Sequence, residues 1–142
     1  MHECKILLVD DDTEDHDIMK EAMESVHAEG LMSFTTSSFQ ALELLDGCAG
    51  DDQLPKLIVL DLNMPIRNGT ETLRILKDNE RYRNIPVIIF STSTNPVEKE
   101  KCLSLGAHDY LIKPSSHKQT VDMVKVFLAF CTLTGNNLDQ LA

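Results

Sequence analysis

The chain has 142 residues, of which 42% are hydrophobic, and it carries a formal net charge of -10 at pH 7. This length predicts one domain with one core, and the acidic balance argues against binding to nucleic acid. No apolar run approaches the roughly 18 residues of a membrane span, and the N-terminal segment lacks the apolar region of a signal peptide, so we expect a cytoplasmic protein. The cysteines are widely scattered, which predicts free thiols at Cys4, Cys48, Cys102 and Cys131.

Short apolar runs alternate with amphipathic segments along the chain. The pattern predicts strands over residues 4–10, 31–36, 56–61, 85–91 and 109–112, and helices over residues 13–27, 37–47, 70–79, 95–106 and 116–133. Strands that alternate with helices through short connections predict a parallel sheet covered on both faces. Residues 134–142 are expected to form a short C-terminal tail, which is too short for an output domain.

The first predicted helix has a capping residue and one apolar face. Thr13 is the expected N-cap, and Ile18, Ala22 and Val26 have the spacing of a buried stripe. The histidines of the chain lack the spacing of a ligand pair and are therefore predicted to lie on the surface. They are His2, His16, His27, His108 and His117.

The last predicted helix has apolar residues on more than one face, although a helix that covers a sheet needs only one stripe. The expected stripe consists of Val121, Val124, Leu128 and Cys131. A second apolar set then remains for a partner surface, formed by Met123, Val126, Phe127 and Phe130. The alternative is that the tail folds back over this set through Leu138 and Leu141.

Acidic residues end two of the predicted strands. Asp10, Asp11 and Asp12 follow the apolar run 6–9, and Asp61 follows the apolar run 57–60. Ligands of open parallel sheets bind at the carboxyl ends of the strands, so these acids mark a candidate site. Carboxylates held together repel one another and must take up protons or be balanced by a cation, and oxygen ligands favour Mg²⁺.

Four segments together resemble the receiver domain of two-component response regulators. VDDD, LDLNMPIRNG, IIFSTS and DYLIKP occur in order at the ends of the first, third, fourth and fifth predicted strands, within a match from Cys4 to Leu133. The residues of the LDLNMP and STS segments are similar to those of stand-alone regulators found with bacterial phytochromes. The resemblance implies a flavodoxin-like, doubly wound (βα)5 fold with strand order 2-1-3-4-5, as a single receiver domain over residues 1–142 without an output domain.

The resemblance also implies roles for the acids. Asp61 would be the phosphoacceptor, a carboxylate nucleophile that takes a phosphoryl group from a phosphohistidine. Asp11 would bind Mg²⁺ directly and Asp10 would bind it through a water molecule, while the backbone carbonyl of Asn63 would complete the protein ligands. Asp12 is expected to face solvent.

Three further residues take roles from the same resemblance. Lys113 would supply a second cation to the phosphoryl group, aimed by a Lys113–Pro114 peptide bond that is commonly cis in the family. Ser91 would hydrogen-bond a phosphoryl oxygen, and Tyr110 would turn inward with it as the switch residue.

Pocket residues depart from the commonest pattern at one position. Thr92 stands where the family usually has alanine or glycine, and its branched side chain is expected to narrow the approach to Asp61. Asn63 and Ser93 would flank the pocket and tune the lifetime of the phosphoryl group.

The implied function is that of a bacterial response regulator, a phosphoprotein that signals through phosphorylation-dependent contacts and is not a turnover enzyme. The expected partners are a sensor histidine kinase or phosphotransfer protein, and an effector or second copy that docks on the fourth helix, fifth strand and last helix. The alternatives are a phosphorelay intermediate and a phosphate-independent binding module. A dehalogenase-type phosphatase is disfavoured because Asn63 replaces its second aspartate, and a flavin carrier because DDDTED replaces a phosphate-binding loop.

Overall fold

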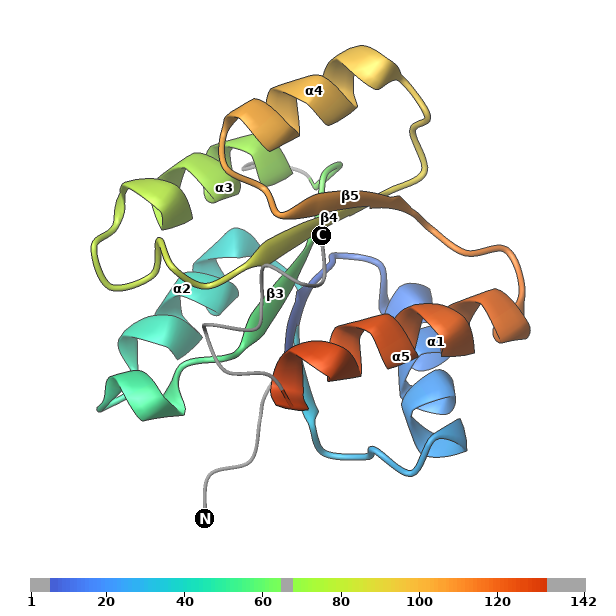
Figure 1. The fold of residues 1–142 in the computed structure, drawn as a ribbon. Helices are drawn as coiled ribbons and strands as arrows, with labels where there is room; N and C mark the ends of the chain where they lie inside the picture. Colours follow the sequence, from blue (N-terminus) through green and yellow to red (C-terminus); the bar gives the residue numbers. More distant parts are fainter. Residues whose placement is uncertain (1–5, 65–67, 133–142) are drawn as a thin grey trace.

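The computed structural model describes residues 6–64 and 68–132 of the chain. Five parallel strands form one sheet in the order β2-β1-β3-β4-β5 (Figure 1). They are β1 (Ile6–Val9), β2 (Met32–Thr35), β3 (Leu57–Asp61), β4 (Val87–Ser91) and β5 (Asp109–Ile112). β1, β3 and β4 are buried along their whole length, as expected for inner strands with helices on both faces. The predicted flavodoxin-like fold and its strand order are confirmed.

Helices cover both faces of the sheet, and a 3-10 turn, η1 (Asp51–Gln53), precedes β3. The helices are α1 (Thr13–Ser25), α2 (Ser38–Asp46), α3 (Gly69–Asp78), α4 (Pro96–Ser104) and α5 (His117–Thr132). α2, α3 and α4 bury Leu45, Leu73 and Cys102 against one face. α1 and α5 lie together on the other face (Figure 1) and bury Met19 and Phe127 there. Each such apolar side chain contributes about 1.5–3 kcal/mol, so the sheet is held from both sides.

Side-chain caps fix where four of these helices begin. Asp12, Ser37, Asn68 and Asn95 each accept a hydrogen bond from a backbone N–H in the first turn of α1, α2, α3 and α4. Such caps satisfy donors that the helix itself leaves unpaired. The predicted cap at Thr13 is therefore wrong, and the exposed Asp12 has that role.

The buried face of α1 differs from the predicted one. Ile18 is 45% exposed, whereas Met19 is fully buried and Ala22 is buried as predicted. The apolar residues of this segment fit two neighbouring helical faces, and spacing alone does not choose between them. Met19 and Met23 pack against the sheet, where the flexible methionine side chain fills irregular space.

His16 is buried, although the sequence predicts a surface residue. Its side chain is 6% exposed, its Nε2 donates a hydrogen bond to the carbonyl oxygen of Asp10 (2.7 Å), and its ring centroid lies 5.3 Å from that of Phe34. A buried imidazole needs such a partner, and histidine spacing in the sequence does not reveal one. The other described histidines are exposed or half-buried, and they are His27, His108 and His117. His2 lies outside the described residues.

α5 turns its aromatic residues toward the sheet. Phe127 and Phe130 are 0% and 2% exposed, beside the buried Val124. The predicted partner surface is therefore wrong at both phenylalanines, because burying an aromatic ring removes more apolar area from water than burying a smaller side chain. Val126 remains 51% exposed. The half-buried apolar residues include Val121, Met123, Leu128 and Cys131. The predicted tail lies outside the described residues.

The cysteines differ in state. Cys48 and Cys102 are free thiols, whereas Cys131 is disulfide-bonded, so the prediction of free thiols is wrong at Cys131. Sequence spacing says little about which cysteines a fold brings together. Cys4 lies outside the described residues. Within the part of the chain that the structure describes, no helix is long and apolar enough to cross a membrane.

Replacing Tyr82 with phenylalanine is expected to lower the free energy of unfolding by about 1–2 kcal/mol. Tyr82 is 3% exposed, and its hydroxyl donates a hydrogen bond to the Asp46 carboxylate at the end of α2, so phenylalanine keeps the packing and removes only the donor. Burial, together with the Asp46 carboxylate, raises the pKa of Tyr82. The stabilisation is therefore complete below the ordinary tyrosine pKa of 10.0 and is lost as the pH rises through the higher pKa of the folded state.

Urea unfolding of wild type and Tyr82→Phe at neutral pH and above pH 10.0 measures this contribution. Asp46→Asn is the matched variant, because it keeps an acceptor and removes the charge. A difference between wild type and Tyr82→Phe that stays constant over the whole range would contradict the assignment.

Candidate functional site

Acidic side chains meet where β1 and β3 end. The two strands are adjacent, and their register pairs Val9 with Leu60, so that Asp10 and Asp61 follow side by side. Carboxylate oxygens of Asp10, Asp11 and Asp61 all lie within 4.8 Å of one another. Because the carboxyl ends of parallel strands meet at one edge, the strand order brings these acids together.

Two of the three carboxylates in this acid cluster are buried. Asp10 and Asp61 are 0% and 3% exposed, whereas Asp11 is exposed. Burial first, and then contact with the Asp15 carboxyl group, raise the pKa of Asp10 to about 8. Burial also raises the pKa of Asp61, against the opposing charge of Lys113. The acid cluster therefore favours the binding of positive charge.

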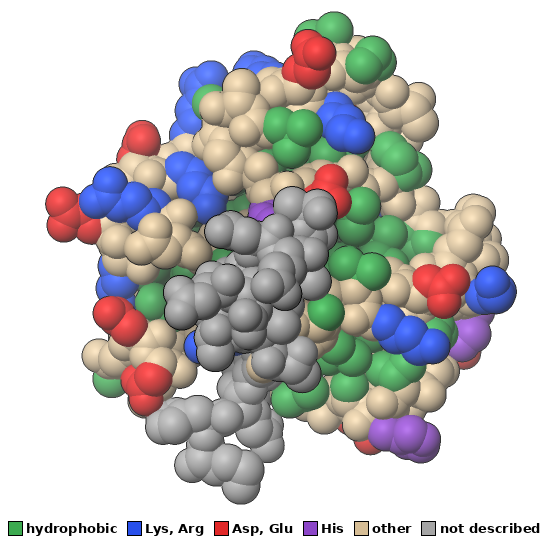
Figure 2. All heavy atoms as spheres, in the orientation of Figure 1, with side chains coloured by type: hydrophobic (Ala, Val, Ile, Leu, Met, Phe, Trp, Pro, Cys, Tyr) green, Lys and Arg blue, Asp and Glu red, His purple; other side chains and the backbone are tan. Residues whose placement is uncertain are grey.

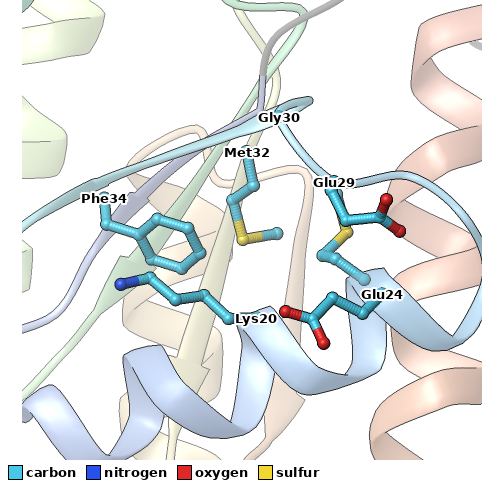
Figure 3. Close-up of a pocket in the computed structure, with 7 residues that line it drawn as sticks. Lys20, Glu24, Glu29, Gly30, Met32 and Phe34 are labelled. Carbon is cyan, nitrogen blue, oxygen red and sulfur yellow. The ribbon is translucent and has the colours of Figure 1, made fainter.

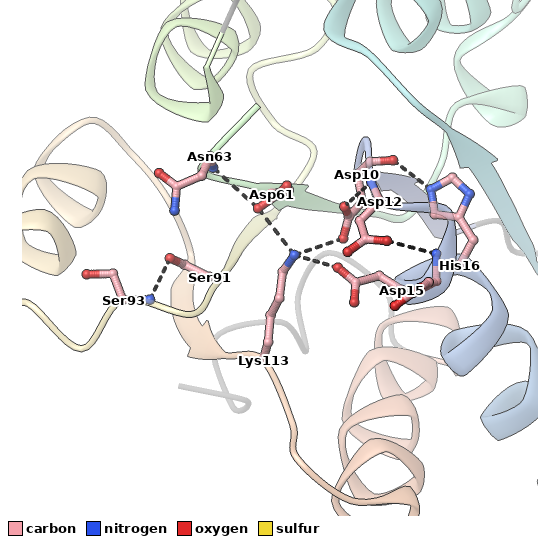
Figure 4. A network of polar contacts seen from close by, with 10 residues as sticks. Asp10, Asp12, Asp15, His16, Asp61, Asn63, Ser91, Ser93 and Lys113 are labelled. Carbon is pink, nitrogen blue, oxygen red and sulfur yellow. Dashed lines mark hydrogen bonds and ion pairs between the residues drawn. The ribbon is translucent and has the colours of Figure 1, made fainter. Parts of the chain in front are cut away.

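Lys113 is the residue that follows β5, and its side chain extends to the acid cluster. Its Nζ donates hydrogen bonds to Oδ2 of Asp15 (2.6 Å) and Oδ2 of Asp10 (3.2 Å), and lies 3.5 Å from Oδ1 of Asp61 (Figure 4). Burial alone would lower the pKa of Lys113, but the bond to Asp15 and the other carboxylates outweigh it and raise the pKa. The ammonium group therefore stays charged.

The backbone at Lys113 places this side chain without a cis peptide. The Lys113 N–H donates to the carbonyl oxygen of Ser91 (2.8 Å), which extends the pairing of β5 with β4 by one residue. Every peptide bond among the described residues is trans, so the expected cis bond before Pro114 is wrong. The sheet pairing fixes the start of the side chain, and the flexible lysine stem carries the ammonium group to the acids.

Ser91, Ser93 and Tyr110 form a chain of hydrogen bonds beside the acid cluster. Ser91 ends β4, where Phe90 pairs with Asp61, and its fully buried Oγ accepts a bond from the Ser93 N–H (3.0 Å). The hydroxyl of Tyr110 donates to the Ser93 carbonyl oxygen (2.9 Å), and the residue is 5% exposed. The tyrosine ring is thus held inside the protein by the loop that follows Ser91.

Sequence comparison finds relatives over most of the chain. The family model for the response regulator receiver domain matches residues 6–125. The chain belongs to the response regulator receiver family. A probable methanogenesis regulatory protein, FilR2 of Methanothrix harundinacea, is 34% identical to this receiver over 86% of this chain and 81% of its own length. The transcriptional regulatory protein CpxR of Escherichia coli is 35% identical over 87% of this chain, but this chain spans only 49% of CpxR.

Solved structures agree with the family. The phosphorylated cyanobacterial phytochrome response regulator RcpA superposes on this receiver with a TM-score of 0.79, at 28% identity, covering 93% of this chain and 97% of RcpA. The Mn²⁺-bound form of response regulator Rcp1 gives a TM-score of 0.76 at 28% identity, covering 92% and 97% of the two chains. The similarity expected from the sequence to regulators associated with phytochromes is confirmed.

The remaining predicted residues of this receiver follow the ends of β3 and β4. The N–H of Asn63 donates to Oδ1 of Asp61 (3.3 Å), and the Asn63 side chain is exposed. Thr92 is exposed beyond the end of β4, and Ser93 is half-buried. The carboxyl ends of β1, β3, β4 and β5 thus carry Asp10 and Asp11, Asp61, Ser91, and Lys113, whereas Tyr110 lies within β5.

Asp15 is a site residue that sequence reasoning missed. It lies in the first turn of α1, three residues after the cap Asp12, and its carboxylate forms the shortest ion pair of Lys113. The acidic run directs attention to the strand end, whereas Asp15 belongs to the helix that follows. The available signal was its position, because side chains in the first turn of that helix lie near the end of β1.

The acid cluster of this receiver fits a divalent cation. Its ligands are carboxylate oxygens within 4.8 Å of one another, two of them from buried side chains. Hard cations such as Mg²⁺ prefer oxygen ligands of this kind. Asp10, Asp11 and Asp61 are therefore the residues that could hold it.

A separate hollow of about 230 Å³ lies between α1 and β2 (Figure 3). The ammonium group of Lys20 lies 5.0 Å from the ring centroid of Phe34 there, and Met23 and Met32 add apolar walls. The lining residues come from α1, β2 and their connection, so this hollow lies apart from the acid cluster.

Proposed function

We propose that this receiver accepts a phosphoryl group on Asp61 from the phosphohistidine of a sensor kinase or phosphotransfer protein, and signals through contacts that depend on phosphorylation. The observation that carries the proposal is the position of Asp61, a buried carboxylate of the acid cluster whose Oδ1 lies 3.5 Å from the ammonium group of Lys113. The family and the likeness to the phosphorylated regulator RcpA support it.

The transfer is a displacement at phosphorus. An oxygen of the Asp61 carboxylate attacks the phosphorus atom, the bond from phosphorus to the donor imidazole nitrogen breaks, and an acyl phosphate forms. Both the nucleophile and the phosphoryl group are negatively charged, so the approach needs cations. Lys113 supplies one charge from the side of β5, and its raised pKa keeps it protonated.

Magnesium held by Asp11 and Asp61, with Asp10 through a water molecule and the backbone carbonyl of Asn63, would neutralise phosphoryl oxygens. The Mn²⁺-bound form of Rcp1 supports a divalent cation in a related protein. Ser91 would hydrogen-bond a phosphoryl oxygen. Its buried position one residue beyond the strand partner of Asp61 supports this role.

The hydrogen bonds from Ser91 through Ser93 to Tyr110 give the proposed switch. A new bond from Ser91 to the phosphoryl group would pull on the Ser93 N–H, and the Ser93 carbonyl oxygen holds the Tyr110 hydroxyl. The phosphoryl group would then shift the balance between an inward position of the Tyr110 ring, as in this structure, and an outward one, because it would interact differently with the two positions.

The proposed partner surface lies over α4, β5 and α5. Figure 2 shows hydrophobic side chains gathered between α4 and α5 on this face. Val97 and Leu103 on α4 are 69% and 40% exposed, Ile112 on β5 is 42% exposed, and Val126 on α5 is 51% exposed. An effector protein or a second copy of the chain would cover these residues, of which Ile112 lies on the same strand as the proposed switch residue Tyr110.

Replacing Thr92 with alanine is expected to speed both reaction with acetyl phosphate and hydrolysis of the phosphoryl group, because the smaller side chain opens the approach to Asp61. The expected change is about threefold, which corresponds to a barrier lower by roughly 0.7 kcal/mol. Rates of phosphoryl gain and loss, followed by intact mass, measure it. Thr94→Ala is the matched control, since Thr94 is exposed on the same loop. Unchanged rates in Thr92→Ala would show that the Thr92 side chain does not limit the approach to Asp61.

Intact mass after incubation with acetyl phosphate, with Mg²⁺ or with a chelator, tests the proposed function. We expect a gain of one phosphoryl group that needs Mg²⁺ and is removed by hydroxylamine, which cleaves acyl phosphates. The same measurement with a phosphorylated histidine kinase as donor tests whether Asp61 accepts a phosphoryl group even if acetyl phosphate does not react. If neither donor gives a gain, the proposal is wrong and a phosphate-independent binding module replaces it.

A further inference from the structure

The carboxylate of Asp15 is the nearest partner of the Lys113 ammonium group. Nζ of Lys113 lies 2.6 Å from Oδ2 of Asp15, compared with 3.2 Å from Asp10 and 3.5 Å from Asp61. The side chains of Asp15 and Lys113 are 19% and 16% exposed, so solvent screens this pair less than an open surface pair. The shortest contact of Lys113 is therefore with a residue outside the acid cluster.

Asp15 and Asp61 approach the ammonium group from different sides (Figure 4). Asp61 comes from the end of β3, whereas Asp15 comes from the first turn of α1. A phosphoryl group on Asp61 would place new negative oxygens on the β3 side of the ammonium group. The Lys113 ammonium group would then have two acceptors for its charge-assisted bonds, the Asp15 carboxylate and the phosphoryl oxygens. Moving toward one acceptor would lengthen its bond to the other.

We infer that Asp15 is a positioning residue that competes with the phosphoryl group on Asp61 for the ammonium group of Lys113, and so limits how firmly Lys113 engages that group. This inference rests on the proposed function. It gives α1 a direct part in setting the stability of the phosphorylated state, because the helix carries the competing carboxylate.

Beryllofluoride, which binds to aspartates as a stand-in for a phosphoryl group, tests the inference without turnover. At saturating Mg²⁺, we expect Asp15→Asn to bind it about threefold to tenfold more tightly than wild type, the factor for loss of one partly exposed charge-assisted bond. Mg²⁺ affinity is measured separately by calorimetry, because removing a charge near the acid cluster also weakens Mg²⁺ binding.

Two variants separate positioning from general effects of charge. Asp17→Asn removes the same charge from an exposed position on the same helix, and is expected to bind beryllofluoride as wild type does. Asp15→Glu keeps the competing charge and is expected to restore affinity toward that of wild type. The ζ-ammonium NMR signal of Lys113 in the absence of beryllofluoride should shift in Asp15→Asn and stay in place in Asp17→Asn.

The outcomes are distinct. If wild type binds beryllofluoride, but Asp15→Asn binds it more weakly than wild type or only as tightly as Asp17→Asn, Asp15 does not compete for Lys113 and the inference is wrong. Failure of wild type to bind beryllofluoride and to gain a phosphoryl group overturns the proposed function, and this inference with it.

Discussion

Replacing Asp61 with asparagine is expected to abolish the phosphoryl gain completely. The amide has nearly the shape of the carboxylate but is no nucleophile at phosphorus, so the acyl phosphate cannot form. The fold should survive, because burial raises the pKa of Asp61 and a neutral side chain suits that position. We therefore expect no phosphoryl gain with acetyl phosphate and Mg²⁺, together with a free energy of unfolding that is no lower than in wild type.

Asp12→Asn is the matched control for this experiment. Asp12 lies in the same acidic run, but it is exposed and caps α1, and asparagine is an equally good N-cap. This variant should keep both the phosphoryl gain and the stability of wild type. A phosphoryl gain that persists in Asp61→Asn would place the acceptor on another residue and reject the assignment.

Replacing Gly69 with alanine is expected to destabilise the protein by about 1–3 kcal/mol and to slow phosphorylation. Gly69 begins α3, and its N–H donates to the Leu62 carbonyl oxygen (2.9 Å), which holds the helix start against the end of β3. A Cβ atom there would lie 2.5 Å from the Asp61 carbonyl oxygen and 2.7 Å from the Leu62 Cα. Both contacts are to backbone, so the segment that carries Asp61 must move.

Gly47→Ala provides the comparison for Gly69→Ala. A Cβ on Gly47 would meet the carbonyl oxygens of Glu43 and Leu44 at 3.5 Å, which is ordinary contact. Urea unfolding gives the stability of both variants, and the initial rate of phosphoryl gain reports the position of Asp61. Equal stabilities for the two alanine variants would show that the backbone near Asp61 yields without cost.

The strands of this fold could be predicted because parallel strands covered on both faces require continuous apolar runs, such as those before Asp10 and Asp61. The faces of α1 and α5 could not, because both helices offer more than one apolar stripe. Ile18 and Met19 lie on neighbouring faces of α1, and only packing against the sheet decides that the face of Met19 is buried. In α5 packing likewise favours the buried Phe127.

Some residues of the candidate site could likewise be predicted from the sequence, and others could not. The meeting of Asp10, Asp11 and Asp61 follows from strand ends, and Lys113 follows from the resemblance to the family. The bond from Lys113 to Asp15 and the bond from His16 to the Asp10 carbonyl depend on how α1 docks beside β1, which no local pattern encodes. The resemblance also supplied a wrong detail, since the bond before Pro114 is trans.

The contact of Lys113 with Asp10 has a consequence for synthesis of the protein, because 103 positions separate the two residues. A ribosome releases the three acids of the cluster well before it releases Lys113, and it releases Phe127 later still. The nascent chain thus carries an acid cluster without its counter-charge and a sheet with one face incompletely covered. Contacts this distant in sequence close late in folding. We therefore expect a translating receiver to be a poor phosphoryl acceptor until almost all of its residues have left the ribosome.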